Sequence, residues 1–264
     1  MHAFAYAQPS ALADAIRAAA DPGAKLIAGG QSLLAAMKLG LAAPEVLVDL
    51  GALAELKSIR VAAGVVRIGA MVTHAEVAAS AEVAQAIPAL ADLAGHIGDR
   101  QVRHRGTLGG SLANNDPAAC YPAAVLGLGA TVHTASPTQT RDIAADDFFT
   151  GLYQTALDEG EVITGVSFAV PAHAGWQKFN QPASRFALVG VFVSQGPQGV
   201  RVAVTGAAAC VFRASGLEAR LAADWSAAAL AGAEVSADDL NGDLHASAEY
   251  RAALIPILAA RAVG

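Results

Sequence analysis

Short apolar runs and amphipathic stretches alternate along the first fifty residues of the chain. Their spacing predicts helices over residues 10–20 and 32–41 and strands over residues 25–28 and 45–50. Ser10 precedes the first helix and is suited to be its N-cap. A strand, a glycine turn, a helix and a second strand follow one another here, which is typical of parallel strands joined by a helix. We therefore expect a small α/β unit at the start of the chain.

The rest of the chain carries further strand and helix patterns. Strands are predicted over residues 65–68, 130–134, 162–170, 188–194 and 200–207, and helices over residues 73–81, 88–97 and 121–128. Residues 98–110 are rich in glycine and arginine and are expected to form a loop. Residues 196–199 separate the last two strands as a hairpin turn does, and the alanine-rich last third is expected to be helical.

Residues 171–175 are the best candidate for a domain boundary. A proline and a glycine bracket a short spacer there, and both residues interrupt regular structure. We expect an N-terminal domain of about 170 residues followed by a smaller α+β domain, in line with ordinary domain sizes.

Composition excludes a disordered chain, and its high apolar fraction owes much to alanine and does not by itself indicate a membrane protein. Hydrophobic residues make up 54% of the chain, charged residues make up 15%, and the mean hydropathy is +0.42. The longest uncharged apolar stretch, residues 123–132, is about half of the ~20 residues that a spanning helix needs. This length predicts no membrane span. The N-terminus lacks the basic region of a signal peptide, so we expect no signal peptide either.

The charge and the cysteine content of the chain argue against two classes of ligand, nucleic acid and metal. The net charge is −6, and Arg100, Arg103 and Arg105 form only one small basic cluster, so nucleic acid is not an expected partner. Cys120 and Cys210 form no CxxC pair and no metal-ligand series. We expect no zinc or iron–sulfur site on this chain, and a reducing compartment fits.

A first glycine loop, Ala28-Gly29-Gly30-Gln31-Ser32-Leu33, joins a predicted strand to a predicted helix. Glycines let the main chain approach a ligand closely, and the free N–H groups at a helix start favour phosphate. An ordinary strand-to-helix turn has the same appearance, so this loop alone leaves both interpretations open.

A second loop, Gly106-Thr107-Leu108-Gly109-Gly110-Ser111, repeats the same chemistry and adds two hydroxyl groups. Two such loops are able to converge on one diphosphate. Neither has the spacing of the Rossmann GxGxxG motif, and neither contains the Gly-Lys-Ser/Thr of a Walker A loop. A dinucleotide bound here would therefore be bound in some other fold.

Three segments resemble one known family. They read AGGQSLLAAMKLGLAAPEVLVDL, IGDRQVRHRGTLGGSLANNDPAACYPAAVLGLGA, and VITGVSFAVP with the later KFNQPASRFALVGV. In this order and spacing they resemble the FAD-binding medium subunit of molybdenum hydroxylases, which is the flavoprotein of aerobic carbon monoxide dehydrogenases and xanthine dehydrogenases. The resemblance spans nearly the whole chain.

The resemblance implies an α+β fold with a two-lobed FAD-binding domain of the vanillyl-alcohol oxidase/MurB type over residues 1–170. A small α/β lobe would cover residues 1–54 and a larger, mainly antiparallel lobe residues 55–170. A small α/β C-terminal domain of the carbon monoxide dehydrogenase flavoprotein type would cover residues 175–264.

The resemblance also implies which residues bind FAD, without a covalent bond. Both glycine loops would clasp the pyrophosphate, three further positions match family contacts, and Asp116 and Phe186 are added as candidates. The full set is Leu26, Ile27, Ala28, Gly29, Gly30, Gln31, Ser32, Leu33, Ile97, Thr107, Leu108, Gly109, Gly110, Ser111, Asp116, Ile163, Lys178 and Phe186.

Three positions depart from the family pattern or allow a plain structural role. Some relatives carry an acidic residue where this chain has Cys120, and Asp116 is the nearest carboxylate, so the residue that binds the FAD ribose is left open. Asp116 is equally suited to start a turn or cap a helix. Phe186 lies where several relatives have an aromatic residue over one flavin face, but a core phenylalanine in a strand would fit as well.

The leading interpretation is a cytoplasmic electron-transfer subunit. FAD would receive electrons from an iron–sulfur small subunit with two-iron, two-sulfur clusters, fed by a molybdenum large subunit, in a dimer of heterotrimers. No residue of this chain is expected to be catalytic or to bind a metal. The alternatives are a stand-alone flavin oxidase or reductase and a scaffold that has lost FAD. Substrate and electron acceptor stay open.

Overall fold

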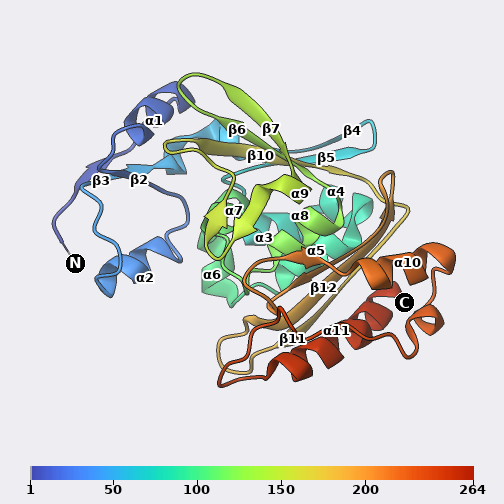
Figure 1. Ribbon diagram of the computed structural model, residues 1–264. Coiled ribbons are helices and arrows are strands. Elements are labelled where there is room, and N and C mark those ends of the chain that lie inside the picture. The colour runs from blue at the N-terminus through green and yellow to red at the C-terminus, as the bar shows by residue number, and fades with distance from the viewer. Residues whose placement is uncertain (1) are drawn as a thin grey trace.

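The computed structural model describes residues 2–264, and its N-terminal part is a three-stranded parallel sheet with two helices (Figure 1). The elements of this small lobe are β1 (Ala5–Ala7), α1 (Leu12–Ala19), β2 (Ala24–Ile27), α2 (Leu33–Lys38) and β3 (Val46–Asp49). The strand order is β1-β3-β2, so the predicted parallel pairing of β2 with β3 is confirmed. The three residues of β1 are too few to show an alternating pattern, and the sequence did not predict this strand.

Both helices of the small lobe are shorter than predicted. The N-cap of α1 is Ala11, and no side chain caps it, so the expected role of Ser10 is wrong. α2 ends at Lys38, two residues before Gly40 adopts a positive φ of 74°. Leu39 and Leu41 follow the helix and are 74% and 79% exposed.

The centre of the molecule is a five-stranded antiparallel sheet in the order β4-β5-β10-β6-β7. Two short 3-10 helices, η1 (Leu50–Ala52) and η2 (Ala54–Leu56), lead into it. Its strands are β4 (Ile59–Ala62), β5 (Val65–Gly69), β6 (Thr131–Ala135), β7 (Thr140–Ala144) and β10 (Val162–Ala169). The edge strands β4 and β7 are short and largely exposed, so neither has the alternating buried face that hydrophobic patterning detects.

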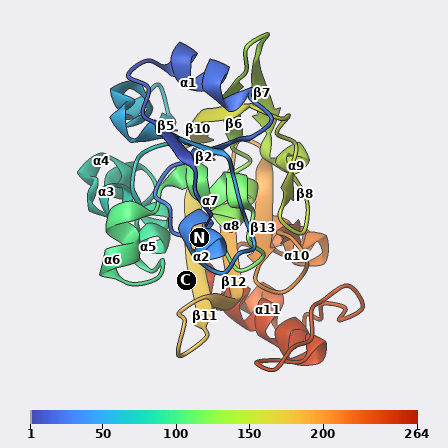
Figure 2. The same cartoon turned by 90° about the vertical axis from the view of Figure 1, so that its left-hand side faces the viewer.

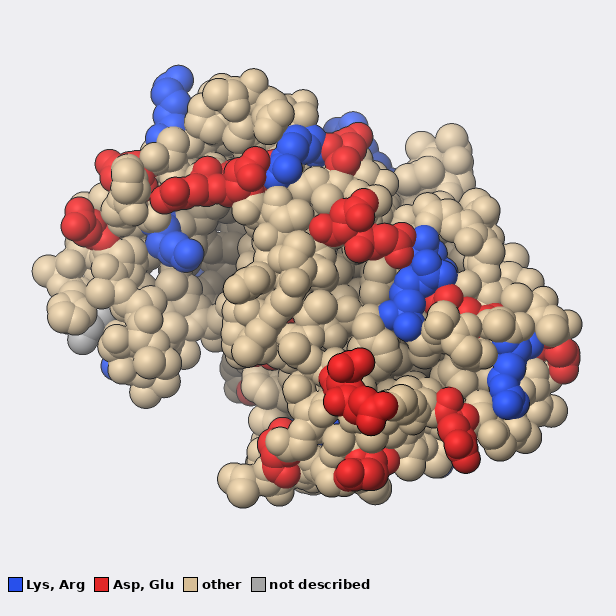
Figure 3. Space-filling view, in the orientation of Figure 1, with Lys and Arg blue, Asp and Glu red and all other residues tan. Residues whose placement is uncertain are grey.

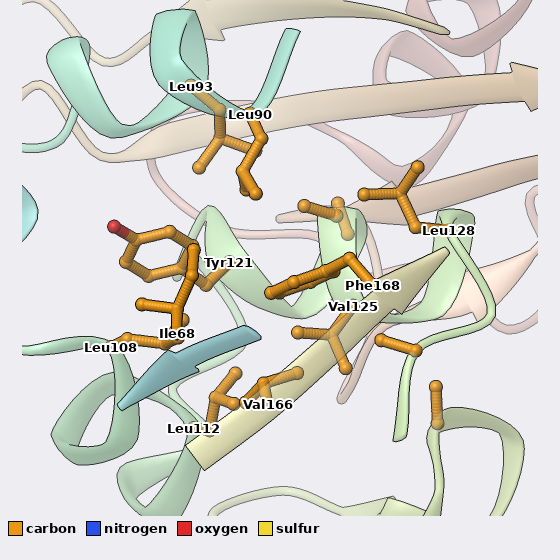
Figure 4. Close-up of a cluster of buried hydrophobic side chains, with 14 of the residues drawn as sticks. Ile68, Leu90, Leu93, Leu108, Leu112, Tyr121, Val125, Leu128, Val166 and Phe168 are labelled. Carbon is orange, nitrogen blue, oxygen red and sulfur yellow. The ribbon is translucent and has the colours of Figure 1, made fainter. Parts of the chain in front are cut away.

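Seven short helices follow β5, and most of them pack against the central sheet. They are α3 (His74–Ala79), α4 (Ala81–Ala86), α5 (Pro88–Gly95), α6 (Arg100–Arg105), α7 (Leu108–Asn114), α8 (Tyr121–Gly127) and α9 (Ala145–Phe148). A two-stranded hairpin of β8 (Phe149–Gly151) and β9 (Gln154–Thr155) follows α9. Figure 4 shows the resulting core, in which Leu108 and Tyr121 lie near Ile68 of β5 and Leu112 lies near Val166 of β10.

The glycine- and arginine-rich stretch predicted as a loop is mostly helical. Asp99 caps α6 by accepting a hydrogen bond from the Val102 N–H at 2.8 Å, and Thr107 caps α7 by accepting one from the Gly110 N–H at 3.1 Å. Arginine and glutamine are good helix formers, so a cap at each start suffices for two short helices separated by Gly106.

The C-terminal part is a four-stranded antiparallel sheet in the order β11-β12-β13-β14, covered by helices. Its elements are β11 (His173–Asn180), β12 (Ala187–Gly196), β13 (Gly199–Thr205), β14 (Phe212–Arg213), α10 (Ser215–Ala223), η3 (Ala227–Leu230) and α11 (Ala248–Val263). The predicted hairpin is confirmed, since Gly196 pairs with Gly199. The helical expectation holds only in part, because residues 231–247 lack helix and strand.

Helix α8 joins the central and C-terminal sheets. A Cβ on Gly127 would lie 2.9 Å from the Phe192 ring of β12, so a glycine is needed for this close packing. The Ser194 hydroxyl donates to the Gly127 carbonyl oxygen at 2.6 Å. Among residues 2–264 no helix has the length and apolar character to cross a membrane.

Candidate functional site

The first glycine loop leaves a row of main-chain donors free. It begins where β2 ends, and Gly30 adopts a positive φ of 71°, which favours glycine. Within residues 2–264 the N–H groups of Gly29, Gly30, Gln31 and Ser32 donate no hydrogen bond. The Gln31 amide folds back onto the Gly29 carbonyl oxygen at 3.1 Å. Successive unpaired N–H groups before a helix form a suitable cradle for an anion.

The two glycine loops lie against each other. A Cβ on Gly29 would lie 2.1 Å from the Arg105 carbonyl oxygen and 2.7 Å from the Gly106 Cα atom. A Cβ on Gly110 would lie 3.4 Å from the Ala28 side chain. The two loops come from different lobes, and Figure 3 shows a hollow between the small lobe and the body of the molecule. The loops therefore meet at one place, as convergence on one diphosphate requires.

The second loop differs from the first because it is the first turn of α7. The Leu108 N–H donates to the Val72 carbonyl oxygen at 3.0 Å, and the Gly109 N–H donates to the Ala70 carbonyl oxygen at 2.8 Å. The Leu108 side chain is fully buried in the core. Thr107 is buried as the N-cap, and the Ser111 hydroxyl makes no hydrogen bond within residues 2–264. This loop therefore offers a closely packed main chain and one hydroxyl group instead of a row of free N–H groups.

Ile163 lies in β10, which is linked to the second loop by main-chain hydrogen bonds through Ala70. The pairing of β10 with β6 shifts register between Ile163 and Gly165. Thr164 uses its carbonyl oxygen to accept from the Ala70 N–H at 3.1 Å, and the Ala70 carbonyl accepts from Gly109. The Ile163 side chain is buried, so it is packed into the wall of this region.

Two more predicted residues, Ile97 and Phe186, lie next to the hydrogen-bond partners of Lys178. The Lys178 ammonium donates to the His96 carbonyl oxygen at 2.6 Å and to the Arg185 carbonyl oxygen at 3.1 Å. These two partners directly precede Ile97, which is half-buried, and Phe186, which is 55% exposed. Phe186 is therefore not a core residue, and that alternative is wrong. Helix α6 leads from this group to the glycine loops.

Cys120 belongs to the Lys178 group. Its Sγ atom lies 3.5 Å from Lys178 Nζ, and burial raises the pKa of the thiol although Lys178 opposes the shift. Within residues 2–264 Lys178 forms no ion pair with a carboxylate. This place therefore carries one positive charge next to a neutral thiol.

Asp116 lies in a turn after α7. Its carboxylate accepts from the Ala118 N–H at 2.8 Å, and the Tyr153 hydroxyl donates to it at 3.4 Å. Asp116 therefore starts a turn, as the sequence analysis allowed. The second carboxylate oxygen is held only by the long bond from Tyr153 on the β8–β9 hairpin.

His74 supports the second loop and was not singled out from the sequence. The main-chain N–H of His74 donates to the Gly106 carbonyl oxygen at 3.0 Å. A Cβ on Gly106 would lie 2.5 Å from Nε2 of the His74 ring. Burial, with a smaller effect of Arg103, lowers the pKa of His74 to about 4. The imidazole is therefore neutral at pH 7 and fills the space beneath Gly106.

A Ser–His–Asp chain also forms across three strands, which residue spacing did not reveal. His133 Nε2 lies 2.7 Å from the Ser167 hydroxyl, and His133 Nδ1 lies 2.6 Å from Asp142 Oδ1. The three residues sit on β6, β10 and β7, whose main-chain donors belong to the antiparallel ladders. An oxyanion hole needs free donors beside the nucleophile, so this chain of bonds serves to tie the strands together.

Two lobes meeting at paired glycine loops, outside the Rossmann and Walker patterns, define a class of protein that binds a diphosphate-bearing cofactor. Residues 2–172 match the family described as the FAD binding domain in molybdopterin dehydrogenase. The chain belongs to this family.

Curated relatives cover almost the whole chain. The nicotine 6-hydroxylase medium subunit of Paenarthrobacter nicotinovorans is 38% identical over 99% of this chain and 96% of its own length. The carbon monoxide dehydrogenase medium chain of Hydrogenophaga pseudoflava is 35% identical over 98% of this chain and 96% of its own. A chain of quinoline 2-oxidoreductase from Pseudomonas putida 86 superposes with a TM-score of 0.89 at 34% identity, covering 99% of this chain and 96% of its own.

These findings confirm the main expectations from the sequence. The chain is a molybdenum hydroxylase flavoprotein of the α+β class, an oxidoreductase subunit of the FAD-binding kind. The individual contacts to FAD stay predictions. Within residues 2–264 no three His, Cys, Asp or Glu side chains gather as a metal site would require.

Proposed function

We propose that this chain holds one FAD, without a covalent bond, between its two glycine loops and the Lys178 group. The observation that carries the proposal is the contact of Gly29 with the main chain of Arg105 and Gly106. The free N–H groups from Gly29 to Ser32 would bind the pyrophosphate, with Ser111 from the other side. The main chain around Ile97, the Lys178 ammonium and the exposed ring of Phe186 would contact the rest of the cofactor. Domain boundaries at residues 1–170 and 175–264 accompany this proposal.

The function that fits this site is electron relay. FAD, when bound, supplies reversible uptake of two electrons and two protons. The chain contributes binding, orientation and the charge of Lys178. Within residues 2–264 no three His, Cys, Asp or Glu side chains gather, which leaves no place for an iron–sulfur cluster, so in this proposal the electrons come from another chain. We propose an iron–sulfur small subunit as the donor, and a molybdenum large subunit as the site of substrate oxidation.

The assembly would be a dimer of such heterotrimers in the cytoplasm. Two relatives are called medium subunit or medium chain, which supports a place beside a larger and a smaller partner. The electron acceptor would be a quinone, NAD⁺ or oxygen.

Isolation of the chain from its native source under mild conditions tests this proposal. Iron–sulfur and molybdenum subunits should co-purify with it, and the complex should contain one FAD per copy of this chain. A chain that is isolated alone and reduces its own FAD with a small organic substrate would establish the stand-alone enzyme instead.

A further inference from the structure

Helix α6 carries basic side chains that no carboxylate neutralises. Arg100, His104 and Arg105 are exposed, and Arg103 is half-buried. Within residues 2–264 none of the three arginines forms an ion pair. Arg103 instead holds the preceding loop, because its guanidinium donates to the Ile97 and Gly98 carbonyl oxygens at 3.0 and 3.1 Å. This cluster is opposite in sign to the net charge of the chain, which is −6.

The basic face borders a hollow of about 330 Å³ between α3, the end of α5 and α6. Its floor consists of small residues, namely Ala75, Ala78, Ala79 and Gly95. Arg100, Arg103 and His104 stand at its edge, spaced to lie on one side of the helix. Small residues with a cationic edge let a partner's chain approach closely and bring a carboxylate with it.

This face adjoins the proposed FAD site. Helix α6 ends at Arg105, whose carbonyl oxygen lies against Gly29. Figure 2 shows α6 at the edge of the molecule, close to α3 and α5.

We propose that the α6 face is the docking surface for the electron-donating iron–sulfur chain, which would present an acidic patch to Arg100 and His104. The inference rests on the proposed function, since a chain that reduces FAD must dock close to it. Opposite charges at such a surface mainly raise the rate of association.

Association kinetics between the full-length, FAD-loaded chain and the purified iron–sulfur chain test the proposal. Arg100→Glu should slow association about tenfold at low salt, and the difference should shrink as salt is added. A glutamate in the first turn of α6 suits the helix, so the fold and the FAD content should be unchanged. Arg100→Lys should restore most of the rate. The control is Arg67→Glu, which makes the same charge change at an exposed position on β5 and should associate at nearly the wild-type rate.

The outcomes separate this inference from the proposed function. If the wild-type chain binds the iron–sulfur chain and Arg100→Glu binds equally fast, the docking surface is wrong and the proposed function stands. The docking surface is also wrong if Arg67→Glu slows association as much as Arg100→Glu does. It is wrong as well if Arg100→Glu slows binding of the molybdenum chain but not of the iron–sulfur chain. If the wild-type chain contains no FAD or binds neither partner, the proposed function itself fails.

Discussion

At Gly29 the main chain of one lobe touches the main chain of the other, and a single methyl group would separate them. A Cβ there would lie 2.1 Å from the Arg105 carbonyl oxygen, which is far below any real contact. In Gly29→Ala the loops must move apart, at a cost of about 1–3 kcal/mol. We therefore expect FAD to bind roughly ten- to hundredfold more weakly, as measured by fluorescence titration of the apoprotein.

The matched control for that variant is Gly216→Ala. Gly216 lies in α10, and a Cβ there would meet no atom within 4 Å. Alanine is the better helix former, so the variant should be up to about 1 kcal/mol more stable and bind FAD normally. Wild-type FAD affinity in Gly29→Ala would show that the contact between the loops does not shape the site.

His74 gives a second prediction at the scale of one residue. Its pKa of about 4 in the folded chain lies below the ordinary 6.5, because burial disfavours the imidazolium. Below pH 6.5 the unfolded chain takes up a proton that the folded chain refuses, so stability falls until the pH reaches about 4. Between pH 7 and pH 5 the loss from His74 should be about 2 kcal/mol.

Denaturant unfolding at both pH values checks this expectation. His74→Asn should lose about 2 kcal/mol less than the wild type between pH 7 and pH 5. The control is His245→Asn, which makes the same replacement at an exposed position. Identical pH profiles for the wild type and His74→Asn would mean that His74 is not held neutral.

Between elements, an ion pair fastens the C-terminal sheet to α9. Arg201 of β13 is buried, and its guanidinium donates to both Asp146 carboxylate oxygens, at 3.0 and 2.8 Å. Hydrogen bonds from Arg201 lower the pKa of Asp146, so the pair contributes stability at neutral pH that is lost in acid. Asp146→Ala leaves a buried cation without its counter-charge.

The expected loss in the free energy of unfolding for Asp146→Ala is about 2 kcal/mol. Breaking a fully buried pair costs more, but the Asp146 side chain is 41% exposed and water replaces part of the interaction. Asp14→Ala, which removes the partner of Arg17 from an exposed pair on α1, should change stability by less than about 0.5 kcal/mol. Equal effects of the two variants would contradict the role given to Arg201.

Elements with a buried apolar face could be predicted from the sequence, and those held by local hydrogen bonds could not. β10, β12 and β13 carry buried apolar residues and were placed correctly. α6 has no buried side chain, so its helix shows no apolar period and depends on the Asp99 cap. The Ser167–His133–Asp142 chain depends on strand register, which the sequence pattern leaves open.

On the scale of the whole molecule, the meeting of the two glycine loops followed from no local pattern. Each loop alone is compatible with an ordinary turn. Two such loops are able to share one diphosphate, but their positions in the sequence do not place them together, and the resemblance to a family implied that they share a ligand. The two loops meet because of how the lobes pack. The segment of η1 and η2 joins the small lobe to the central sheet, and Gly29 lies against Gly106. The cluster around Lys178 likewise joins residues that are far apart in the sequence.

The relay proposal predicts what the isolated chain does on its own. Dithionite should bleach its flavin, whereas carbon monoxide, purines and aldehydes should leave the oxidised spectrum unchanged. The reason is that no three His, Cys, Asp or Glu side chains gather as a metal site within residues 2–264, and the proposal places substrate oxidation on another chain. Anaerobic spectra recorded before and after each addition check this, and bleaching by an aldehyde or a purine would favour the stand-alone enzyme.

The flavin content of the chain purified in its native complex tests the central claim most directly. We predict one FAD for each copy of this chain, all of it released into the supernatant by acid precipitation, and none retained by the precipitated polypeptide. A chain purified without flavin from such a complex, or flavin that stays on the polypeptide after acid treatment, would contradict non-covalent binding between the glycine loops.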